Sequence, residues 1–353
     1  MPVRFTQIDA QSSVGRLKIR LRRLLNDLNN RRSGALVPIN QPLILISQIQ
    51  RSGGTLLSQL FDDHPELHAH PHELYWGRPM RWHWPNLTLS GGRADDYFRD
   101  LFEKPLLDLA LNGYRKFGAG DIRPQSFPFC FNLTQQERVF KAIITQHPAR
   151  AQRDVLNAYM TAYFNAWVDY QNLYHEPKRF VTAFVPRLNM EEASVERFFH
   201  DYRDGFLVCI QRNPVDWYAS AKSHFTSEYH DLSHALGLWQ SSVQASIKLY
   251  AQGEKRTMLV QFESLVEDRE RVMRKLCERI GIEFNRSLLL PTFNSMNIGP
   301  NSSFASSRKA EDHRTQKQNR DHHRLKDEER DFIERTYSSM YKEVVSQCLC
   351  PLT

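Results

Sequence analysis

The sequence predicts an α/β fold, a three-layer sandwich in which helices cover both faces of a central parallel sheet. Short apolar runs alternate along the chain with segments of helical periodicity, as in folds built from strand–helix units. The runs are continuously apolar, which is typical of strands buried on both faces. Between about residues 75 and 175 the alternation stops and three helical patterns follow one another, which predicts a helical insertion.

The chain begins with a basic amphipathic segment. In residues 12–32, leucines recur at helical spacing with Arg and Lys between them. Such a helix either packs on its own domain with a solvated basic face, the favoured interpretation, or lies on a membrane surface or a partner. We therefore expect an N-terminal helix and linker at 1–40 and a main domain at 41–310. A charged loop and a C-terminal helix that packs on the domain are expected at 311–353.

The elements of the main domain follow in order. The apolar runs predict strands at 43–47, 179–184, 205–212 and 256–262. Helical patterns outside the insertion lie at 55–63, 214–225 and 267–280, and Gly281 marks a helix end. Within the insertion, helices are expected near 95–117, 133–147 and 151–170.

Net charge, apolar runs and cysteine content limit which ligands and which cellular location are expected. The net charge of +7 over 353 residues favours an anionic ligand, and a phosphate-rich cofactor accounts for it without nucleic acid. No apolar run reaches about 18 residues, and the N-terminus lacks a secretory signal pattern. Five cysteines without a Cys-x-x-Cys pair favour a reducing compartment. A cytoplasmic protein is therefore expected.

The loop "QRSGGTLL" after the first strand has the features of an anion site. Backbone N–H groups and a helix start provide partial positive charge there. Gly53 and Gly54 permit close approach of a ligand, Ser52 and Thr55 carry hydroxyl donors, and Arg51 carries a planar fork that suits phosphate or sulfate. The alternative is a simple tight turn with Thr55 near a helix N-cap. The spacing of a triphosphate loop with its lysine is missing.

A second polar pair follows the strand at 205–212. Arg212 stands at the predicted mouth of the sheet, Pro214 suits the first turn of a helix, and Ser220 lies one to two turns further on. Arg212 and Ser220 together would hold a second phosphate. This strand ends in Gln211-Arg212 instead of an acid that could hold Mg²⁺, which predicts an anion site that needs no metal.

These two segments resemble the sulfotransferases that use 3′-phosphoadenosine 5′-phosphosulfate (PAPS). In that family an Arg-Ser-Gly-Thr/Gly-Thr-Leu loop binds the 5′-phosphosulfate, and the segment from Arg51 to Leu56 matches it. The family binds the 3′-phosphate with Arg-x-Pro and a Ser eight residues after the Arg, as in Arg212 and Ser220. The resemblance implies a P-loop-type fold, PAPS as donor, adenosine 3′,5′-bisphosphate (PAP) as product, and no metal.

A third segment, from about 260 to 310, resembles the C-terminal part of bacterial and carbohydrate-type members. The resemblance places Ser303 and Phe304 in a loop that closes over the nucleotide, and lets Arg308 or Lys309 reach the 3′-phosphate. One departure is clear. The Lys-x-Pro of many relatives is replaced by "VPR", so that Arg187 either substitutes for the lysine or its role is absent.

Transfer to a hydroxyl needs a base as well as stabilisation of charge on the sulfate oxygens, for which Arg51 is suited. Several branches of the family use a Glu at the end of the strand after the loop helix, and Glu73 is closest to that position. His72 and His70 are rivals, because neutral imidazole is a natural base near pH 7. The tryptophans that follow, Trp76, Trp82 and Trp84, are more simply core than an acceptor platform.

The leading hypothesis is a sulfotransferase acting on a hydroxyl of a sugar, lipid or secondary metabolite. A second enzyme hypothesis is a P-loop kinase with a degenerate loop. The absence of the loop lysine and of an acidic residue at the strand end argues against this hypothesis. A non-catalytic protein that binds nucleotides or polyanions is the third. Three histidines in the polar segment 308–330 are better explained by a charged loop than by a metal site.

Overall fold

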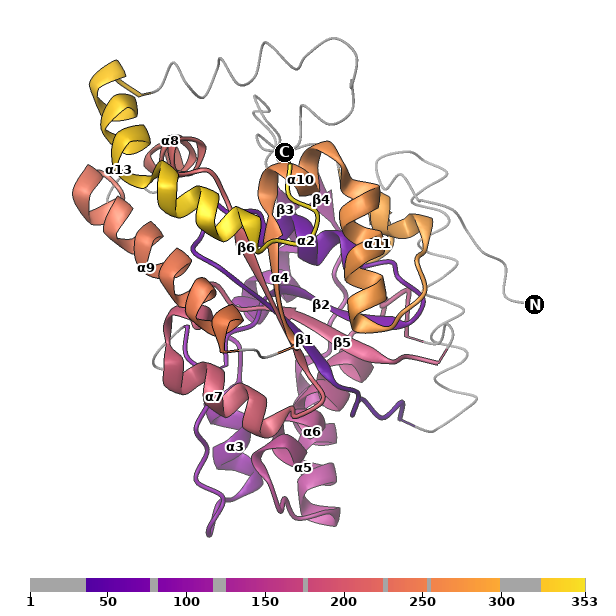
Figure 1. The fold of residues 1–353 in the computed structure, drawn as a ribbon. Helices are drawn as coiled ribbons and strands as arrows, with labels where there is room; N and C mark the ends of the chain where they lie inside the picture. The colour runs from indigo at the N-terminus through magenta and orange to yellow at the C-terminus, as the bar shows by residue number, and fades with distance from the viewer. Residues whose placement is uncertain are drawn as a thin grey trace.

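The computed structural model describes residues 36–76, 82–116, 125–173, 177–224, 228–252, 255–298 and 325–352. Its centre is a five-stranded sheet in the order β2-β5-β1-β6-β7 (Figure 1). Every neighbouring pair in this sheet is parallel. The strands are β1 Leu43–Ser47, β2 Leu67–Glu73, β5 Phe180–Phe184, β6 Phe206–Gln211 and β7 Thr257–Gln261. The predicted α/β fold class is confirmed.

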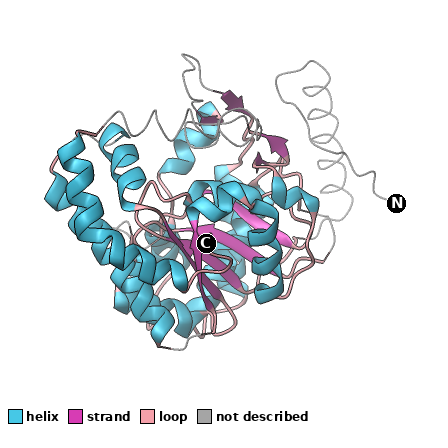
Figure 2. Cartoon of the chain, turned by 45° about the horizontal axis from the view of Figure 1, so that its top comes forward, coloured by secondary structure: helices cyan, strands magenta, loops and turns pink. Residues whose placement is uncertain are grey.

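Two apolar cores, one on each face of the sheet, explain why the strands are continuously apolar. Along β1, Leu43 and Leu45 pack into one core while Ile44 and Ile46 pack into the other. Helices surround the sheet on both sides (Figure 2). One core includes side chains of α2 Gly54–Phe61, α10 Phe262–Glu267 and α11 Arg269–Ile280. The other includes those of α6 Gln152–Ala166, α7 Glu192–Asp201, α8 Pro214–His224 and α9 Leu232–Ala251.

Strand β2 does not show the apolar pattern of the other strands. Its sequence, LHAHPHE, contains three histidines and Pro71. It lies at an edge of the sheet, where a proline costs no ladder hydrogen bond, and its pairing with β5 is irregular between Ala69 and Glu73. The edge position therefore explains both its polar composition and the absence of a clear strand signal.

The prediction of one helix near 95–117 is wrong, because the structure has two shorter helices and a strand there. The chain forms α3 Ala94–Leu101, becomes extended at Phe102, and starts α4 Pro105–Asn112 with Pro105 in its first turn. After Gly113, at φ 71°, it forms β3 Tyr114–Lys116, which pairs antiparallel with β4 Gln125–Phe127. The insertion also contains α5 Leu133–Gln146, which packs on α6. The last predicted helix of the insertion ends at Ala166, earlier than expected.

Smaller elements and the C-terminal helix complete the described chain. They are η1 Leu188–Met190, η2 Arg286–Leu289, the hairpin of β8 Thr292–Phe293 and β9 Met296–Asn297, and α13 Asp327–Ser346. Helix α13 packs on α8 and α9. The basic segment 12–32 and residues 311–324 lie outside the described residues. Among the described helices, none combines the length and apolar character that crossing a membrane requires.

Candidate active site

The turn between β1 and α2 is closely packed around its two glycines. A Cβ on Gly53, which has φ 106°, would lie 2.4 Å from a ring carbon of Phe262. A Cβ on Gly54 would lie 2.1 Å from the side-chain nitrogen of Gln48 and 2.5 Å from Phe184. Within the described chain, no side chain caps the start of α2. A helix start without a side-chain cap is a place where backbone amides can hold an anion.

The two predicted halves of the anion site meet in the structure. The Arg51 Nε donates to the Ser220 Oγ at 3.1 Å, and the Arg212 Nη1 donates to the Arg51 carbonyl at 2.8 Å. This contact follows from topology, because β1 and β6 are adjacent parallel strands and their carboxyl ends share one edge of the sheet. Segments about 160 residues apart in the sequence therefore form one cationic site.

Buried polar atoms at this site lack protein partners. Arg212 is 7% exposed, and its guanidinium lies over the Phe262 ring, with the Cζ 4.6 Å from the ring centroid. Neither its Nε nor the amide atoms of Gln48 have a hydrogen-bond partner among the described residues. Buried polar groups are normally paired. A ligand with several anionic oxygens would complete the hydrogen bonding of Arg212, and the donor set of two guanidiniums, hydroxyls and a helix start fits a bisphosphorylated nucleotide.

A pocket of about 170 Å³ lies beside the loop. It is formed by α2, the end of β2, β3 and β5, and its lining residues are Thr55, Ser58, Gln59, Pro71, His72, Glu73, Tyr114 and Phe184. Glu73 is half-buried at the end of β2, and its Oε2 accepts a hydrogen bond from the Tyr75 hydroxyl at 3.3 Å. The pocket thus brings a carboxylate next to the first turn of the helix that carries the anion loop.

His72 also lines the pocket, but its imidazole is engaged. The His72 Nδ1 donates to the Glu73 carbonyl at 2.7 Å, and its Nε2 accepts from the Tyr163 hydroxyl at 3.1 Å. Burial, and then the charge of His70, lower the pKa of His72 to about 4. His70 is fully buried, and Glu103 from the segment between α3 and α4 lies 3.2 Å from its Nε2. Glu103 was missed, because thirty residues of sequence separate it from the histidines.

Lys116 also lies near the site, although the sequence patterns did not predict it as a site residue. It ends β3, and its Nζ donates to the Gln59 Oε1 at 2.7 Å. The Gln59 Nε2 in turn donates to the Tyr114 hydroxyl at 2.9 Å. Burial, and then the neighbouring charge of Arg51, lower the pKa of Lys116 to about 7. No sequence signal could have found it, because its position depends on how the insertion folds back on α2.

Arg187 is held at the margin of the site. It forms an ion pair with Glu228, donates to the Tyr229 hydroxyl at 2.6 Å, and lies over the Trp82 ring at 4.2 Å. Trp76 and Trp84 are 1% and 2% exposed and contact each other in the core, as expected. The remaining predicted cofactor residues, Ser303, Phe304, Arg308 and Lys309, lie outside the described residues.

The parallel sheet flanked by helices, with the glycine turn before α2 and two arginines at one sheet edge, defines an α/β fold of the sulfotransferase type. The sequence profile of the sulfotransferase family matches residues 42–286, which is more than half of the chain. The chain belongs to the sulfotransferase family, and it is an enzyme of the sulfotransferase class. The resemblance stated from the sequence motifs is confirmed, and membership implies PAPS as the sulfuryl donor.

Solved structures of bacterial sulfotransferases are also similar to this chain. The sulfotransferase domain of the olefin synthase of Synechococcus PCC 7002 is 19% identical, with 76% of this chain and 80% of that one covered, at a TM-score of 0.39. A sulfotransferase from Mycobacterium avium is 14% identical, with 93% of this chain and 82% of that one covered, at a TM-score of 0.40. A sulfotransferase from Alicyclobacillus acidocaldarius is also 14% identical, with 87% of this chain and 94% of that one covered, at a TM-score of 0.39. No curated protein sequence matches the chain significantly.

Proposed function

We propose that this enzyme transfers the sulfuryl group of PAPS to a hydroxyl of a sugar, lipid or secondary metabolite. The observation that supports the proposal is that Arg51 contacts both Arg212 and Ser220 at one edge of the sheet. Two cationic groups placed there suit a nucleotide with anionic groups at its 5′ and 3′ positions. The bound cofactor supplies the activated sulfuryl group.

The donor is held by residues from three segments. Arg51, the amides of residues 52–54, the hydroxyls of Ser52 and Thr55, and the backbone at Leu56 hold the phosphosulfate end. Arg212 and Ser220 hold the 3′-phosphate, with Arg308 or Lys309 in support, and Ser303 and Phe304 cover the nucleotide. The buried position of Arg212 supports this assignment, because a guanidinium held out of water binds a phosphate more strongly than an exposed one. No metal is needed to hold either group.

Glu73 takes the proton of the acceptor hydroxyl. Its position in the pocket beside Thr55 and Ser58 allows an acceptor oxygen to lie between the carboxylate and the loop. Glu73 would accept this proton as the acceptor oxygen receives the sulfuryl group that bound PAPS supplies, with PAP as the product left behind. Arg51 stabilises charge on the sulfate oxygens. His72 is the weaker candidate, because both of its ring nitrogens are engaged and its pKa is low.

The first experiment measures PAP binding by calorimetry. We expect the native protein to bind PAP without added metal, and Arg51→Ala to bind it about 10- to 100-fold more weakly, because one or more charge-assisted hydrogen bonds are lost. Arg99→Ala is the matched control, since Arg99 is exposed and pairs with Asp96 on α3. Unchanged affinity of Arg51→Ala would contradict the donor assignment.

The second experiment is an acceptor screen with labelled PAPS, starting with carbohydrates and lipids. Label appearing in a hydroxyl acceptor supports the transferase. Transfer from labelled ATP in the presence of Mg²⁺ would instead support the kinase reading. Binding of PAP without transfer to any acceptor class would favour the non-catalytic binding protein.

A further inference from the structure

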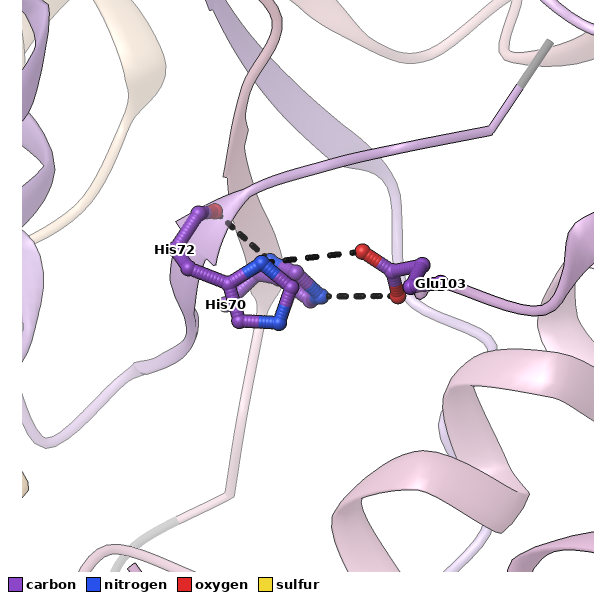
Figure 3. Close-up of side chains that lie close together, drawn as sticks. All are labelled: His70, His72 and Glu103. Carbon is purple, nitrogen blue, oxygen red and sulfur yellow. Dashed lines mark hydrogen bonds and ion pairs between the residues drawn. The ribbon is translucent and has the colours of Figure 1, made fainter. Parts of the chain in front are cut away.

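Three potential metal ligands converge in the interior beside the active-site pocket. His70, His72 and Glu103 each place a possible metal-binding atom within 4.8 Å of the other two, and each imidazole faces one oxygen of the Glu103 carboxylate (Figure 3). The His70 Nε2 is 3.2 Å from one oxygen of Glu103, and the His72 Nδ1 is 3.7 Å from the other. Tetrahedral zinc, with bonds of about 2.1 Å, holds its donor atoms about 3.4 Å apart. The two nitrogen–oxygen distances are close to this value, and each involves a different oxygen of Glu103.

The hydrogen bonds around the cluster determine which ring nitrogen of His70 carries a proton. The His70 Nδ1 lies 2.9 Å from the His72 carbonyl, which can only accept, so this nitrogen carries a proton. In a neutral His70 the Nε2 is then an unprotonated nitrogen that faces a carboxylate oxygen. A cation must lie between these two atoms, either a proton or a metal ion, because buried lone pairs do not face each other unpaired.

Each ligand also has a partner that orients it. His70 donates its other ring N–H to the His72 carbonyl, and the His72 Nε2 lies 3.1 Å from the Tyr163 hydroxyl. The oxygens of Glu103 accept from the Tyr159 hydroxyl at 3.3 Å and from the Tyr75 amide at 3.1 Å. Histidines and carboxylates that bind metals are characteristically held by such outer contacts. His70 and Glu103 are thus fixed in advance, whereas the His72 Nδ1 must exchange its hydrogen bond with the Glu73 carbonyl for the ion.

We propose that His70, His72 and Glu103 bind one divalent transition-metal ion, with Zn²⁺ as the best fit. Two imidazoles and one carboxylate favour zinc over Mg²⁺ or Ca²⁺, which prefer all-oxygen ligands. His72 lines the pocket and gives the ion a route to the otherwise buried cluster. Binding replaces the proton between His70 and Glu103, and it moves the proton of His72 from Nδ1, where it faces the Glu73 carbonyl, to Nε2, where the Tyr163 hydroxyl can accept it.

The ion would tie the end of β2 to the segment between α3 and α4. It therefore supports the strand end that carries Glu73, without taking part in sulfuryl transfer. The inference does not rest on the proposed transfer to a hydroxyl, because its readout is metal content and not activity. It departs from the expectation of a protein that holds no metal, but it leaves the phosphosulfate loop free of metal.

The test uses the full chain purified without a histidine tag. After treatment with a chelator, the protein is titrated with Zn²⁺ and Co²⁺ and dialysed, and bound metal is counted by mass spectrometry. We expect about one ion per chain, a Co²⁺ absorption spectrum of nitrogen and oxygen ligation, and no displacement by Mg²⁺. Proton release should accompany Zn²⁺ binding, because the ion takes the place of the proton between His70 and Glu103.

Matched variants decide where the ion binds. His70→Gln and Glu103→Gln should each weaken Zn²⁺ binding at least tenfold. His68→Gln should not, although His68 is equally buried and lies two residues earlier on β2, because its ring contacts Phe164 and Tyr170. In a second control variant, the three histidines at 313, 322 and 323 are replaced with Gln. This variant should still bind the ion. Circular dichroism verifies that each variant is folded.

Several outcomes would overturn the proposal. One is a native protein that takes up neither Zn²⁺ nor Co²⁺ at micromolar concentration, which assigns the cluster to a proton-bridged ion pair. Another is metal binding that survives in Glu103→Gln, a variant of nearly unchanged shape that serves even if His70→Gln fails to fold. A thiolate band in the Co²⁺ spectrum, or loss of the ion in the second control, would place the metal elsewhere.

Discussion

Glu73 and His72 are adjacent in the sequence, but their surroundings suit them to different tasks. His72 is enclosed between the Glu73 carbonyl and the Tyr163 hydroxyl, and its low pKa keeps it neutral. Glu73 ends the strand with its side chain at the pocket beside the anion loop. Both side chains line the pocket, but the ring nitrogens of His72 are engaged by other protein groups.

We expect Glu73→Gln to bind PAP as the native protein does and to lose turnover by about 10²- to 10⁴-fold, the usual contribution of a general base. Gln keeps the shape of the side chain but cannot take the proton. Binding is measured by calorimetry and turnover with labelled PAPS and an acceptor from the screen. Native turnover in this variant, together with a loss in His72→Gln, would place the base at His72.

Lys116 provides a prediction on pH dependence. Its pKa, lowered to about 7 by burial and by Arg51, leaves it mostly neutral at pH 8. An anion bound at the Arg51 loop stabilises the charged form, so PAP binding at pH 8 should take up part of a proton. Calorimetry in buffers of different ionisation enthalpy measures this uptake. Lys116→Met should reduce it, and equal uptake by the two proteins would show that Lys116 does not sense the ligand.

At the scale of elements, the turn between β1 and α2 is shaped by its packing as much as by its ligand. The ring of Phe262, at the start of α10, fills the space where a Gly53 side chain would lie. The same ring supports the Arg212 guanidinium. The start of α10 thus positions the anion loop and the end of β6 together, although it lies far from both in the sequence.

Gly53→Ala should therefore lower both stability and PAP affinity. A non-glycine residue at φ 106° is strained, and the added methyl would overlap the Phe262 ring, so a loss of about 1–3 kcal/mol in the free energy of unfolding is expected. Gly237→Ala is the matched control, because nothing lies within 4 Å of its Cβ position on α9. This second change should stabilise the protein by about 0.5–1 kcal/mol. Urea unfolding measures both, and native-like stability of Gly53→Ala would contradict the packing argument.

On the scale of the whole molecule, Asp62 connects distant parts of the chain. It follows α2, and its Oδ2 accepts from the Thr292 hydroxyl at 2.9 Å and from the Ser295 amide at 2.8 Å. Nearby, the Asn294 side chain accepts from the Gln171 amide. These bonds connect the β8–β9 hairpin to the end of α2 and to the last residues of the insertion. Burial nevertheless raises the pKa of Asp62 to about 6, against the lowering effect of its hydrogen bonds.

The raised pKa of Asp62 predicts a loss of stability with rising pH. Its folded-state pKa lies above its ordinary value of 3.8, so its contribution is present below pH 4 and is lost as pH rises through about 6. The difference between these values corresponds to about 3 kcal/mol. In Asp62→Asn this loss should disappear, since the amide oxygen can still accept both hydrogen bonds. Urea unfolding between pH 4 and pH 7 tests this, and parallel pH profiles for the two proteins would refute it.

Much of the scaffold and of the anion site could be predicted from the sequence. Buried parallel strands must be apolar on both faces, which made β1, β5, β6 and β7 visible. The Arg51 loop is a local motif, and its meeting with Arg212 follows because parallel strands end at the same edge. Helix periodicity did not reveal the break after Leu101, where the change in direction depends on a proline and on packing in the insertion.

The sequence by itself determined the fold class and the family, because burial pattern and short-range spacing are local properties. Only the tertiary structure decided the strand order, the edge position of β2, and the approach of Lys116 to the loop. It alone also brought Glu103 to His70 and His72. Such contacts join segments that are far apart in the sequence, and local sequence patterns carry no information about which distant segments will meet.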